Sequence, residues 1–272
     1  MTPQNPSLIR KFIIFLVAAM LSVPAIALDF DQIQRAAIQG NVDAQMQLGA
    51  IYYQGKGVQQ DYTKALEWFT KPANQGNAAS QGLLGFMYYR GEGVQQDYAK
   101  ALEWFTKSAN QGEVNSQHMI GSIYYYGKGV RQDYAKALEW FTKSANQGDA
   151  TSQRMLGLLY EEGKGVRQDY VQARQWYEKS ANQGDRSSQF SMGNAYANGR
   201  GVRQDYGKAL EWFKKSANQG SAAAQAYIGI MYEFGKGVPN DKKIAKEWYG
   251  KSCDSGYQVG CDNYRELNQQ GH

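Results

Sequence analysis

The sequence contains few of the side chains that usually perform catalysis. Its 272 residues include only two cysteines, Cys253 and Cys261, and two histidines, His118 and His272. A zinc ion needs three or four clustered ligands, which these histidines do not supply. No serine precedes a lysine by three residues, the spacing of a serine β-lactamase, and no Gly-x-Ser-x-Gly motif occurs. We therefore predict no catalytic residue, no metal site and no cofactor.

The two cysteines lie eight residues apart near the C-terminus. We interpret them as a disulfide that joins the last two of the helices predicted below. A redox-active pair and a metal site are alternatives, although no Cys-x-x-Cys motif is present and no histidine lies nearby. The adjacent acids Glu161 and Glu162 are typical of the solvated end of a helix.

An apolar run near the N-terminus predicts an export signal. Arg10 and Lys11 precede this run at residues 12–28, and Ala-Ile-Ala at 25–27 fits a signal-peptidase site. We predict a signal peptide and an exported bacterial protein, either periplasmic or secreted. An uncleaved anchor is the alternative, but the run is short for a membrane span. After cleavage we expect no membrane-spanning segment. A net charge of +5 does not suggest a nucleic-acid binder.

Repeats of 36 residues account for most of the remaining sequence. All six tryptophans stand 36 residues apart, at Trp68, Trp104, Trp140, Trp176, Trp212 and Trp248. A Gly-x-Gly-Val motif recurs with the same step, as does the Leu-Gly-x-x-Tyr core seen at 48–52 and 156–160. A fixed period of this length is the signature of a stacked repeat architecture. Phosphate-binding loops rich in glycine follow a strand, whereas a helical pattern precedes Gly-x-Gly-Val, so we interpret the motif as a turn.

Each repeat is predicted to form two antiparallel helices, called A and B below. Helix A of the first repeat, at 42–54, follows a capping residue, Asn41, and ends at Gly55. Helix B covers about 62–75, and the polar residue directly before it is expected to cap it. A glycine in the middle of helix A, Gly49, recurs in every repeat. Because a mid-helix glycine costs about 1 kcal/mol relative to alanine, its recurrence suggests a close approach of two helices.

Two residues depart from the shared pattern. Glu113 stands where other repeats have a short capping side chain, and we expect it to cap poorly. Pro72 stands where the other repeats have serine. Proline inside a helix removes a hydrogen bond and clashes with the preceding turn, so we expect helix B of the first repeat to kink or end early.

Stacking is required because a single helix pair cannot bury its own apolar face. The sequence therefore predicts an all-α solenoid of six 36-residue helix-turn-helix repeats. The predicted organisation is a signal peptide at 1–27, a capping helix at 28–40, six repeats at 41–256, and a capping helix with a tail at 257–272.

The repeats share the pattern A-x-x-x-LG-x-x-Y-x-x-G-x-GV-x-x-D-x-x-x-A-x-x-W-x-x-x-(S/A)A-x-x-G, which resembles the Sel1-like repeat, a relative of the tetratricopeptide repeat. The resemblance covers about residues 40–260. It implies a right-handed α/α superhelix that serves as an adaptor for proteins or peptides, and we expect a monomer. The spacing of Cys253 and Cys261 resembles the cysteine-rich secreted branch, although only the last repeat carries the pair. Because some members of that branch are linked to β-lactams, a hydrolase of β-lactam or cell-wall type is an alternative function.

The resemblance places partner binding on a concave face, beside the Leu-Gly-x-x-Tyr core of helix A. In the first three repeats these positions are rich in aromatic and Met side chains, which are enriched in interface cores. The predicted partner-binding residues are Met46, Tyr53, Phe86, Tyr89, Arg90, His118, Met119, Tyr125, Tyr126, Arg154 and Glu161. The alternative is that some of these side chains pack against a neighbouring repeat. Relatives in pathogens imply a role in contact with host cells.

Cations recur in the loop between helices A and B. Those predicted to form a basic ridge are Lys128, Arg131, Lys164, Arg167, Arg200 and Arg203. Such a ridge suits an anionic envelope polymer, which is a second alternative function. Solvation of the surface explains the same residues.

Overall fold

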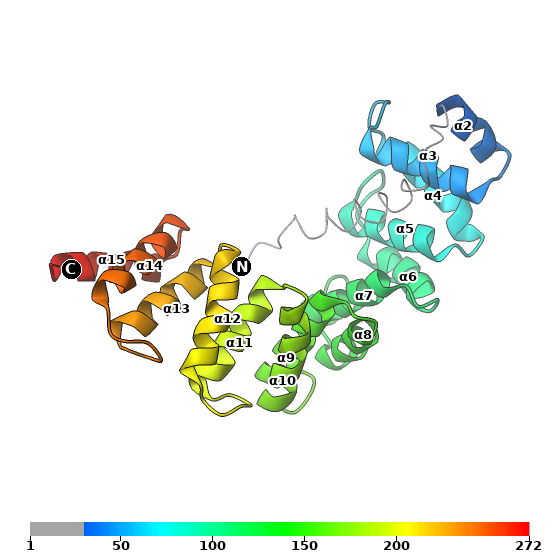
Figure 1. Ribbon diagram of the computed structural model, residues 1–272. Coiled ribbons are helices and arrows are strands. Elements are labelled where there is room, and N and C mark those ends of the chain that lie inside the picture. Colours follow the sequence, from blue (N-terminus) through cyan, green and yellow to red (C-terminus); the bar gives the residue numbers. More distant parts are fainter. Residues whose placement is uncertain (1–29, 272) are drawn as a thin grey trace. The chain divides into compact units, whose positions relative to one another are not determined.

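The computed structural model describes residues 30–271, so the predicted signal peptide at 1–27 lies outside the described part. The described residues form fourteen helices and no strand, as predicted (Figure 1). The helices are α2 (Phe30–Ile38), α3 (Val42–Gln54), α4 (Tyr62–Asn74), α5 (Ala78–Arg90), α6 (Tyr98–Ala109), α7 (Val114–Tyr126), α8 (Tyr134–Asn146), α9 (Ala150–Glu162), α10 (Tyr170–Asn182), α11 (Arg186–Asn198), α12 (Tyr206–Asn218), α13 (Ala222–Glu233), α14 (Lys242–Asp254) and α15 (Gln258–Gln269). None of them is long and apolar enough to span a bilayer.

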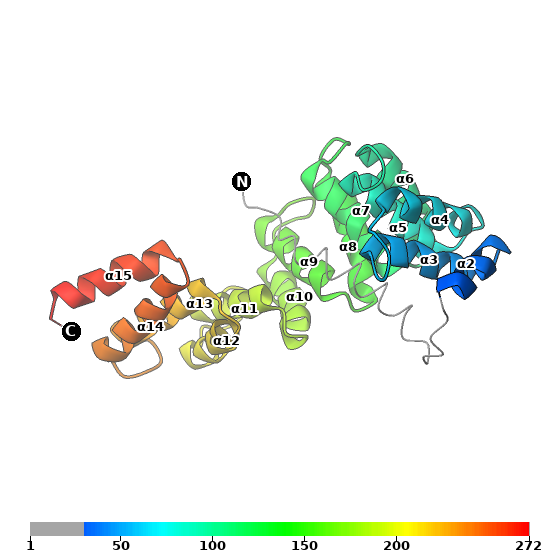
Figure 2. The same ribbon diagram turned by 90° about the horizontal axis from the view of Figure 1, so that it is seen from above.

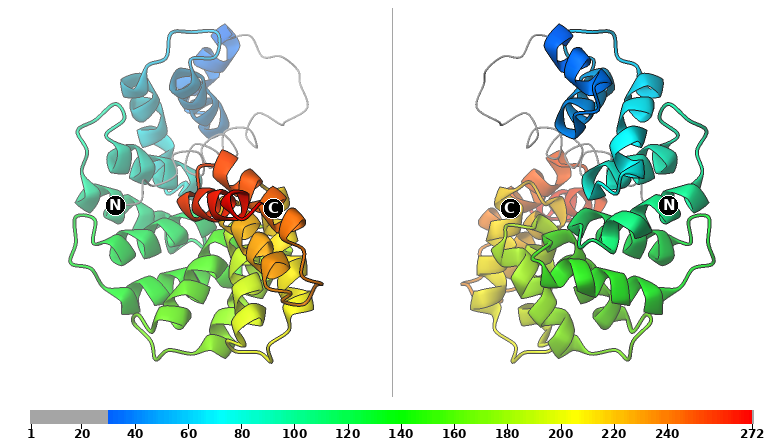
Figure 3. Two further views of the ribbon diagram at one scale, coloured as in Figure 1. Left: turned by 90° about the vertical axis from the view of Figure 1, so that its left-hand side faces the viewer. Right: turned by 90° about the vertical axis from the view of Figure 1, so that its right-hand side faces the viewer.

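The chain divides into two compact units. Unit 1 ends at Gln132 and contains α2 to α7, and unit 2 begins at Asp133 and contains α8 to α15. Within each unit, successive helices pack side by side in chain order, as the views in Figure 2 and Figure 3 show. The odd-numbered helices from α3 to α13 are the A helices of the six repeats. The even-numbered helices from α4 to α14 are the B helices.

The helix ends follow the capping pattern of the sequence. Asn41 Oδ1 accepts a hydrogen bond from the backbone N–H of Ala44 at 2.8 Å, and Gly55 ends α3 with a φ of 70°. The expectation for Glu113 was wrong, because its Oε2 accepts from the backbone N–H of Ser116 at 2.6 Å. The longer glutamate side chain thus satisfies the same orphan donor that aspartate or asparagine satisfies elsewhere.

Pro72 neither shortens helix B of the first repeat nor prevents its normal end. Helix α4 has 13 residues, as α8 does, and both end at the same repeat position. The carbonyl of Pro72 accepts from the backbone N–H groups of Gln75 and Asn77, at 3.1 and 3.0 Å. Proline keeps its carbonyl acceptor, so these C-terminal bonds form as they do with serine in the other repeats. The expected early end of this helix is therefore wrong.

The recurrent glycine of helix A lies against an aromatic ring of helix B. A Cβ atom on Gly193 would stand 2.5 Å from Cδ1 of Phe213, and one on Gly49 would stand 2.6 Å from Cε1 of Phe69. Real side chains do not approach so closely, so only glycine permits this contact. The predicted close approach of the two helices is confirmed.

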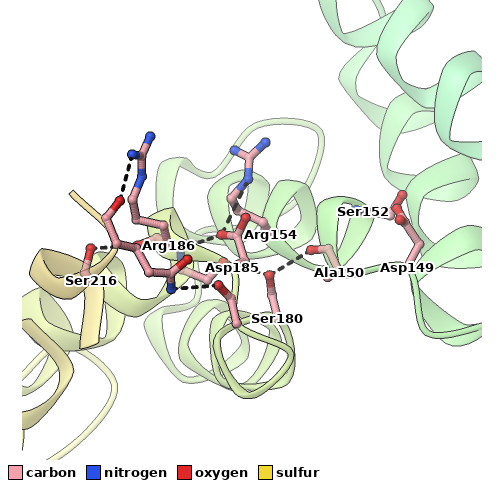
Figure 4. A network of polar contacts seen from close by, with 11 residues as sticks. Asp149, Ala150, Ser152, Arg154, Ser180, Asp185, Arg186 and Ser216 are labelled. Atoms are coloured by element: carbon pink, nitrogen blue, oxygen red, sulfur yellow. Dashed lines mark hydrogen bonds and ion pairs between the residues drawn. The ribbon is translucent and has the colours of Figure 1, made fainter. Parts of the chain in front are cut away.

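Buried polar groups connect the two helices of a repeat. In unit 2, the Ser180 hydroxyl of α10 donates to the carbonyl of Ala150 in α9 at 2.8 Å (Figure 4). The Ser216 hydroxyl of α12 donates in the same way to the carbonyl of Arg186 in α11, also at 2.8 Å. These bonds satisfy the buried serine hydroxyls, which water does not reach, by a second hydrogen bond to a carbonyl in the first turn of each A helix.

The last two helices are joined covalently. Cys253 of α14 and Cys261 of α15 form the predicted disulfide, with their Cα atoms 4.4 Å apart. Gly260 lies beside Ser252, where an added Cβ would collide with the serine side chain. The disulfide therefore joins α15 to α14 beside this close contact. In the chain-entropy model, closing so short a loop contributes about 2–3 kcal/mol.

Replacing Gly193 with alanine is expected to destabilise the protein by about 1–3 kcal/mol, because the new methyl group overpacks the ring of Phe213. The matched control is Gly250→Ala in α14, where a Cβ would make an ordinary 3.4 Å contact with Tyr264. That variant gains helix propensity and is expected to be neutral or stabilised by up to about 1 kcal/mol. Urea unfolding followed by circular dichroism measures both values. Equal effects of the two substitutions would contradict the role of the glycine contact.

Candidate partner-binding surface

Four of the predicted partner-binding side chains are buried in unit 1. Met46, Phe86, Tyr89 and Met119 expose only 5%, 2%, 7% and 8% of their surface. A side chain this deeply buried contributes packing and offers little area to a partner. For these four residues the structure therefore favours the packing alternative, which corrects their assignment as groove residues.

Tyr53 and Arg90 are brought together by a residue that the sequence patterns did not indicate. The Tyr53 hydroxyl donates to Glu92 Oε2 at 2.6 Å, and Arg90 Nε lies 3.2 Å from Glu92 Oε1. Burial, followed by the hydrogen bond to Glu92, raises the pKa of Tyr53 well above its ordinary value. Its hydroxyl therefore stays protonated and donates at all physiological pH values. The contact links the first two repeats, because Tyr53 belongs to α3 and Glu92 follows α5.

Two predicted partner-binding residues of unit 1 are exposed, Tyr126 at the end of α7 and Arg90 at the end of α5. The ring of Tyr126 is 49% exposed and stands edge-on to the ring of Tyr125, with centroids 4.9 Å apart. His118 is half-buried on the same helix, with Nε2 3.4 Å from the hydroxyl of Ser122. Of the predicted residues in unit 1, Tyr126 and Arg90 thus present the most surface to a partner.

Glu161 is engaged by other side chains of unit 2. Its Oε2 accepts from the Tyr177 hydroxyl at 2.7 Å, and its Oε1 lies 3.5 Å from Arg200 Nη1. Burial and the charge of Glu161 raise the pKa of Tyr177. Tyr249 donates in the same way to Glu233, at 2.6 Å. A glutamate at this A-helix position thus occurs in the two repeats where the B-helix ring is tyrosine, and it satisfies the buried hydroxyl.

Arg154 faces the cap of the next A helix. Its Nε lies 3.9 Å from Oδ1 of Asp185, the residue that caps α11 (Figure 4). Both side chains are about one-quarter exposed. An exposed ion pair at this distance contributes little to stability, so Arg154 keeps most of its capacity to contact a partner.

The loop cations differ in whether they form ion pairs within the protein. In unit 2, Lys164 pairs with Glu162 at 2.7 Å, and Arg200 pairs with Glu161. Arg167 and Arg203 are exposed and make no ion pair within residues 30–271. In unit 1, Lys128 is half-buried and Arg131 is exposed. The predicted ridge is therefore not uniform, and its continuity remains a prediction.

The lysines near the ends of the B helices lie over aromatic rings. In every repeat a lysine lies over the indole ring of the tryptophan three residues before it, with Nζ 3.8–4.4 Å from the ring centroid. These lysines are Lys71, Lys107, Lys143, Lys179, Lys215 and Lys251. The recurring Trp-x-x-Lys spacing was visible in the sequence and indicates this cation–π contact.

A second group of aromatic side chains, in unit 2, was not among the predicted site residues. Phe190 of α11 and Tyr227 of α13 are half-buried, and their ring centroids lie 5.4 Å apart. The buried Phe213 of α12 lies beneath both, at 5.7 and 5.3 Å. The signal in the sequence was the presence of two aromatic residues where the other repeats have none.

Comparison with known proteins identifies the repeats. The model of the Sel1 repeat matches six consecutive stretches, at 42–77, 78–113, 114–149, 150–185, 186–221 and 222–257. The chain belongs to the Sel1 repeat family. Sel1 repeats generally form non-enzymatic scaffolds for protein interactions. This chain is a solenoid of six Sel1 repeats.

Two solved structures are similar over most of the chain. One is c5321, a protective antigen present in uropathogenic Escherichia coli strains and displaying an SLR fold, with 36% identity and a TM-score of 0.88. The match covers 96% of this chain and 57% of that one, so this chain spans little more than half of that protein. The other is a Sel1 repeat protein from Oxalobacter formigenes, with 31% identity, a TM-score of 0.69, and coverage of 84% and 100%. The comparison with curated protein sequences found no match.

The Tyr177–Glu161 contact is testable by a double-mutant cycle. Tyr177→Phe leaves the carboxylate without its donor, and Glu161→Ala leaves the buried hydroxyl without its acceptor, so each is expected to cost about 1–3 kcal/mol. The double variant carries the residues of the fifth repeat, Phe213 and Ala197, and is expected to cost less than the sum by about 0.5–3 kcal/mol. Urea unfolding measures the cycle. Strictly additive losses would show that the two side chains do not stabilise each other.

Proposed function

We propose that this Sel1-repeat chain is an exported, non-enzymatic scaffold that binds protein or peptide segments through its A helices. The proposal rests on how the repeats differ. Side chains that pack, such as the glycine of helix A and the ring of helix B, recur with little change. The accessible A-helix positions differ from repeat to repeat, and they include Tyr126, Arg154 and Phe190. Positions that are both accessible and variable are where a scaffold can carry a specific partner site.

Export to the bacterial periplasm or beyond is part of the proposal. It is supported by the signal-peptide pattern at 1–27 and by the disulfide, which persists in oxidising compartments. The similarity to a protective antigen of uropathogenic strains supports a role at the surface that meets a host.

Export is tested by the mass of the mature protein. Expression of the full sequence in a bacterial host is expected to yield a periplasmic chain that begins at Leu28. Intact-mass spectrometry under non-reducing conditions is expected to show no free thiol. A chain that retains residues 1–27 in the membrane fraction would support an uncleaved anchor and contradict this part of the proposal.

Partner binding is tested by site-specific photo-crosslinking. A photoreactive phenylalanine analogue placed at Tyr126, an exposed A-helix position, is expected to yield a discrete crosslinked protein species in cells. The same analogue at Val171, which is 47% exposed at the start of α10, serves as the matched control. The crosslinked species is expected at position 126 and not at 171, because the A helices carry the variable surface. Equal crosslinking at both positions would indicate non-specific contact and reject the assignment.

A further inference from the structure

Helix α15 occupies the place of an A helix in a seventh repeat, but it lacks the features of one. Its residues lie 36 positions after those of α13. Arg265 stands where each of the six A helices has its mid-helix glycine, so the ring of a further B helix has no room to pack there. No B helix follows α15 within residues 30–271. Helix α15 is therefore held by α13 and α14 alone.

The packing that holds α15 in place is sparse. Only Gly260 and Leu267 are buried in this helix, whereas α13 buries six residues. Its N-cap residue, Tyr257, makes no side-chain capping bond, although each of the six A helices has one. A helix of 12 residues is marginal in water unless tertiary packing stabilises it. The stability of α15 therefore depends strongly on its attachment to α14.

The polar contacts of α15 add little to this attachment. Two exposed lysines of α14 donate to side-chain amide oxygens of α15, at 2.7 and 3.1 Å. Exposed bonds of this kind exchange readily with bonds to water and contribute little to stability. One more bond joins Asn263 of α15 to the hydroxyl of Tyr249. The covalent bond between Cys253 and Cys261 is thus the strongest link between the two helices.

An apolar end face of the last repeat lies beneath α15. Ala245 and Tyr249 of α14 have no exposed surface and form a cluster with Leu267 of α15. Ile230 and Tyr232 of α13 pack against the same cluster. Displacement of α15 would expose this end face to water, which is unfavourable for apolar surface. Whether α15 is docked therefore decides whether the last repeat presents an apolar or a covered end.

The disulfide lies near the surface of unit 2. Both cysteines are half-buried, and the residues next to them, Asp254 and Asp262, are exposed. Thiol–disulfide exchange requires that a thiolate reach one of the two sulfur atoms. A disulfide at the surface allows this approach, whereas one enclosed in a core does not.

We propose that Cys253 and Cys261 form a redox latch for α15. As a disulfide they hold α15 on the last repeat, and as thiols they release it and uncover the apolar end face. The inference goes beyond the proposed scaffold function and takes from it only the transfer of the chain to an oxidising compartment. Because the cytosol keeps thiols reduced, the latch of an exported chain closes only after the chain has left it.

The chemistry of the latch is thiol–disulfide exchange with a dithiol or a disulfide donor. One thiolate of the dithiol attacks a sulfur of the bond, which gives a mixed disulfide and one cysteine thiol. The second thiolate of the dithiol then displaces the other cysteine, and the reagent becomes a disulfide. The dithiol thus supplies both electrons, and two cysteine thiols are formed. A disulfide donor closes the latch by the reverse sequence.

Hydrogen exchange followed by mass spectrometry tests the latch on the purified chain. The chain is measured oxidised, in dithiothreitol, and after reoxidation with oxidised glutathione. The amides of α15 are expected to exchange about tenfold or more faster in the reduced chain, because the cross-link that disfavours the undocked state is absent. Helices α9 and α11 are the internal reference and are expected to keep their rates. Reoxidation is expected to restore the slow exchange of α15.

A double variant, Cys253→Ser with Cys261→Ser, provides the matched control. Its α15 amides are expected to exchange rapidly both with and without dithiothreitol, which shows that the reagent acts through this bond. Trypsin gives a second measurement in the absence of reductant. Arg265 is exposed on α15, and cleavage after it requires the helix to open. The double variant is expected to lose residues 266–272 rapidly, whereas the oxidised chain is expected to resist.

Two results would overturn the latch. Equal exchange of α15 in the oxidised and reduced chains would show that packing alone holds the helix. Faster exchange throughout unit 2 on reduction would show that the bond stabilises the whole unit and not one helix. Neither result touches the proposed export or partner binding. Conversely, a chain that is not exported would contradict the proposed function without changing the exchange of the purified protein.

Discussion

Within each unit, an aromatic ring of a B helix lies directly against the glycine backbone of its A helix, and this contact sets the distance between the two helices of a repeat. At Gly193 or Gly229 no side chain larger than hydrogen fits. Such proximity allows the buried serine of the B helix to reach a carbonyl at the start of the A helix. The inter-helix hydrogen bonds and the close packing thus both depend on one small residue facing one large ring.

The type of ring in this contact also determines whether the end of the A helix must carry a hydrogen-bond acceptor. Where the ring is phenylalanine, as in Phe213, it carries no polar atom and the A helix needs no acceptor. Where the ring is tyrosine, as in Tyr177 and Tyr249, its hydroxyl is enclosed and must donate. Glu161 and Glu233 supply the acceptor from one helical turn after the glycine. An acid on the A helix, which by itself indicates a charged surface for a partner, is here a consequence of the packing.

Much of the fold could be predicted from the sequence because its signals are local and repeated. The capping residue Asn41 and the turn at Gly55 each depend on interactions within a few residues. The spacing of the tryptophans shows that this local pattern recurs along the chain. What could not be predicted depends on neighbouring helices. Whether Phe86 or Tyr89 faces a groove or the core is set by what packs on α5, and the pattern of one helix is the same in both cases. Pro72 misled for a related reason, since proline removes one donor near the end of α4 but keeps the carbonyl from which the C-terminal bonds form, and the helix still extends to Asn74.

Some of the charged and aromatic side chains serve the fold, and the others remain candidates for function. Six lysines lie over tryptophan rings, so their positive charge is already engaged with an electron-rich surface. Most tyrosines hold repeat positions. What remains is a small set of departures from the register, and these divide in the same way: Phe190 and Tyr227 pack on the buried ring of Phe213, whereas Tyr126 and Phe234 are exposed, so only the exposed rings offer their full surface to a partner.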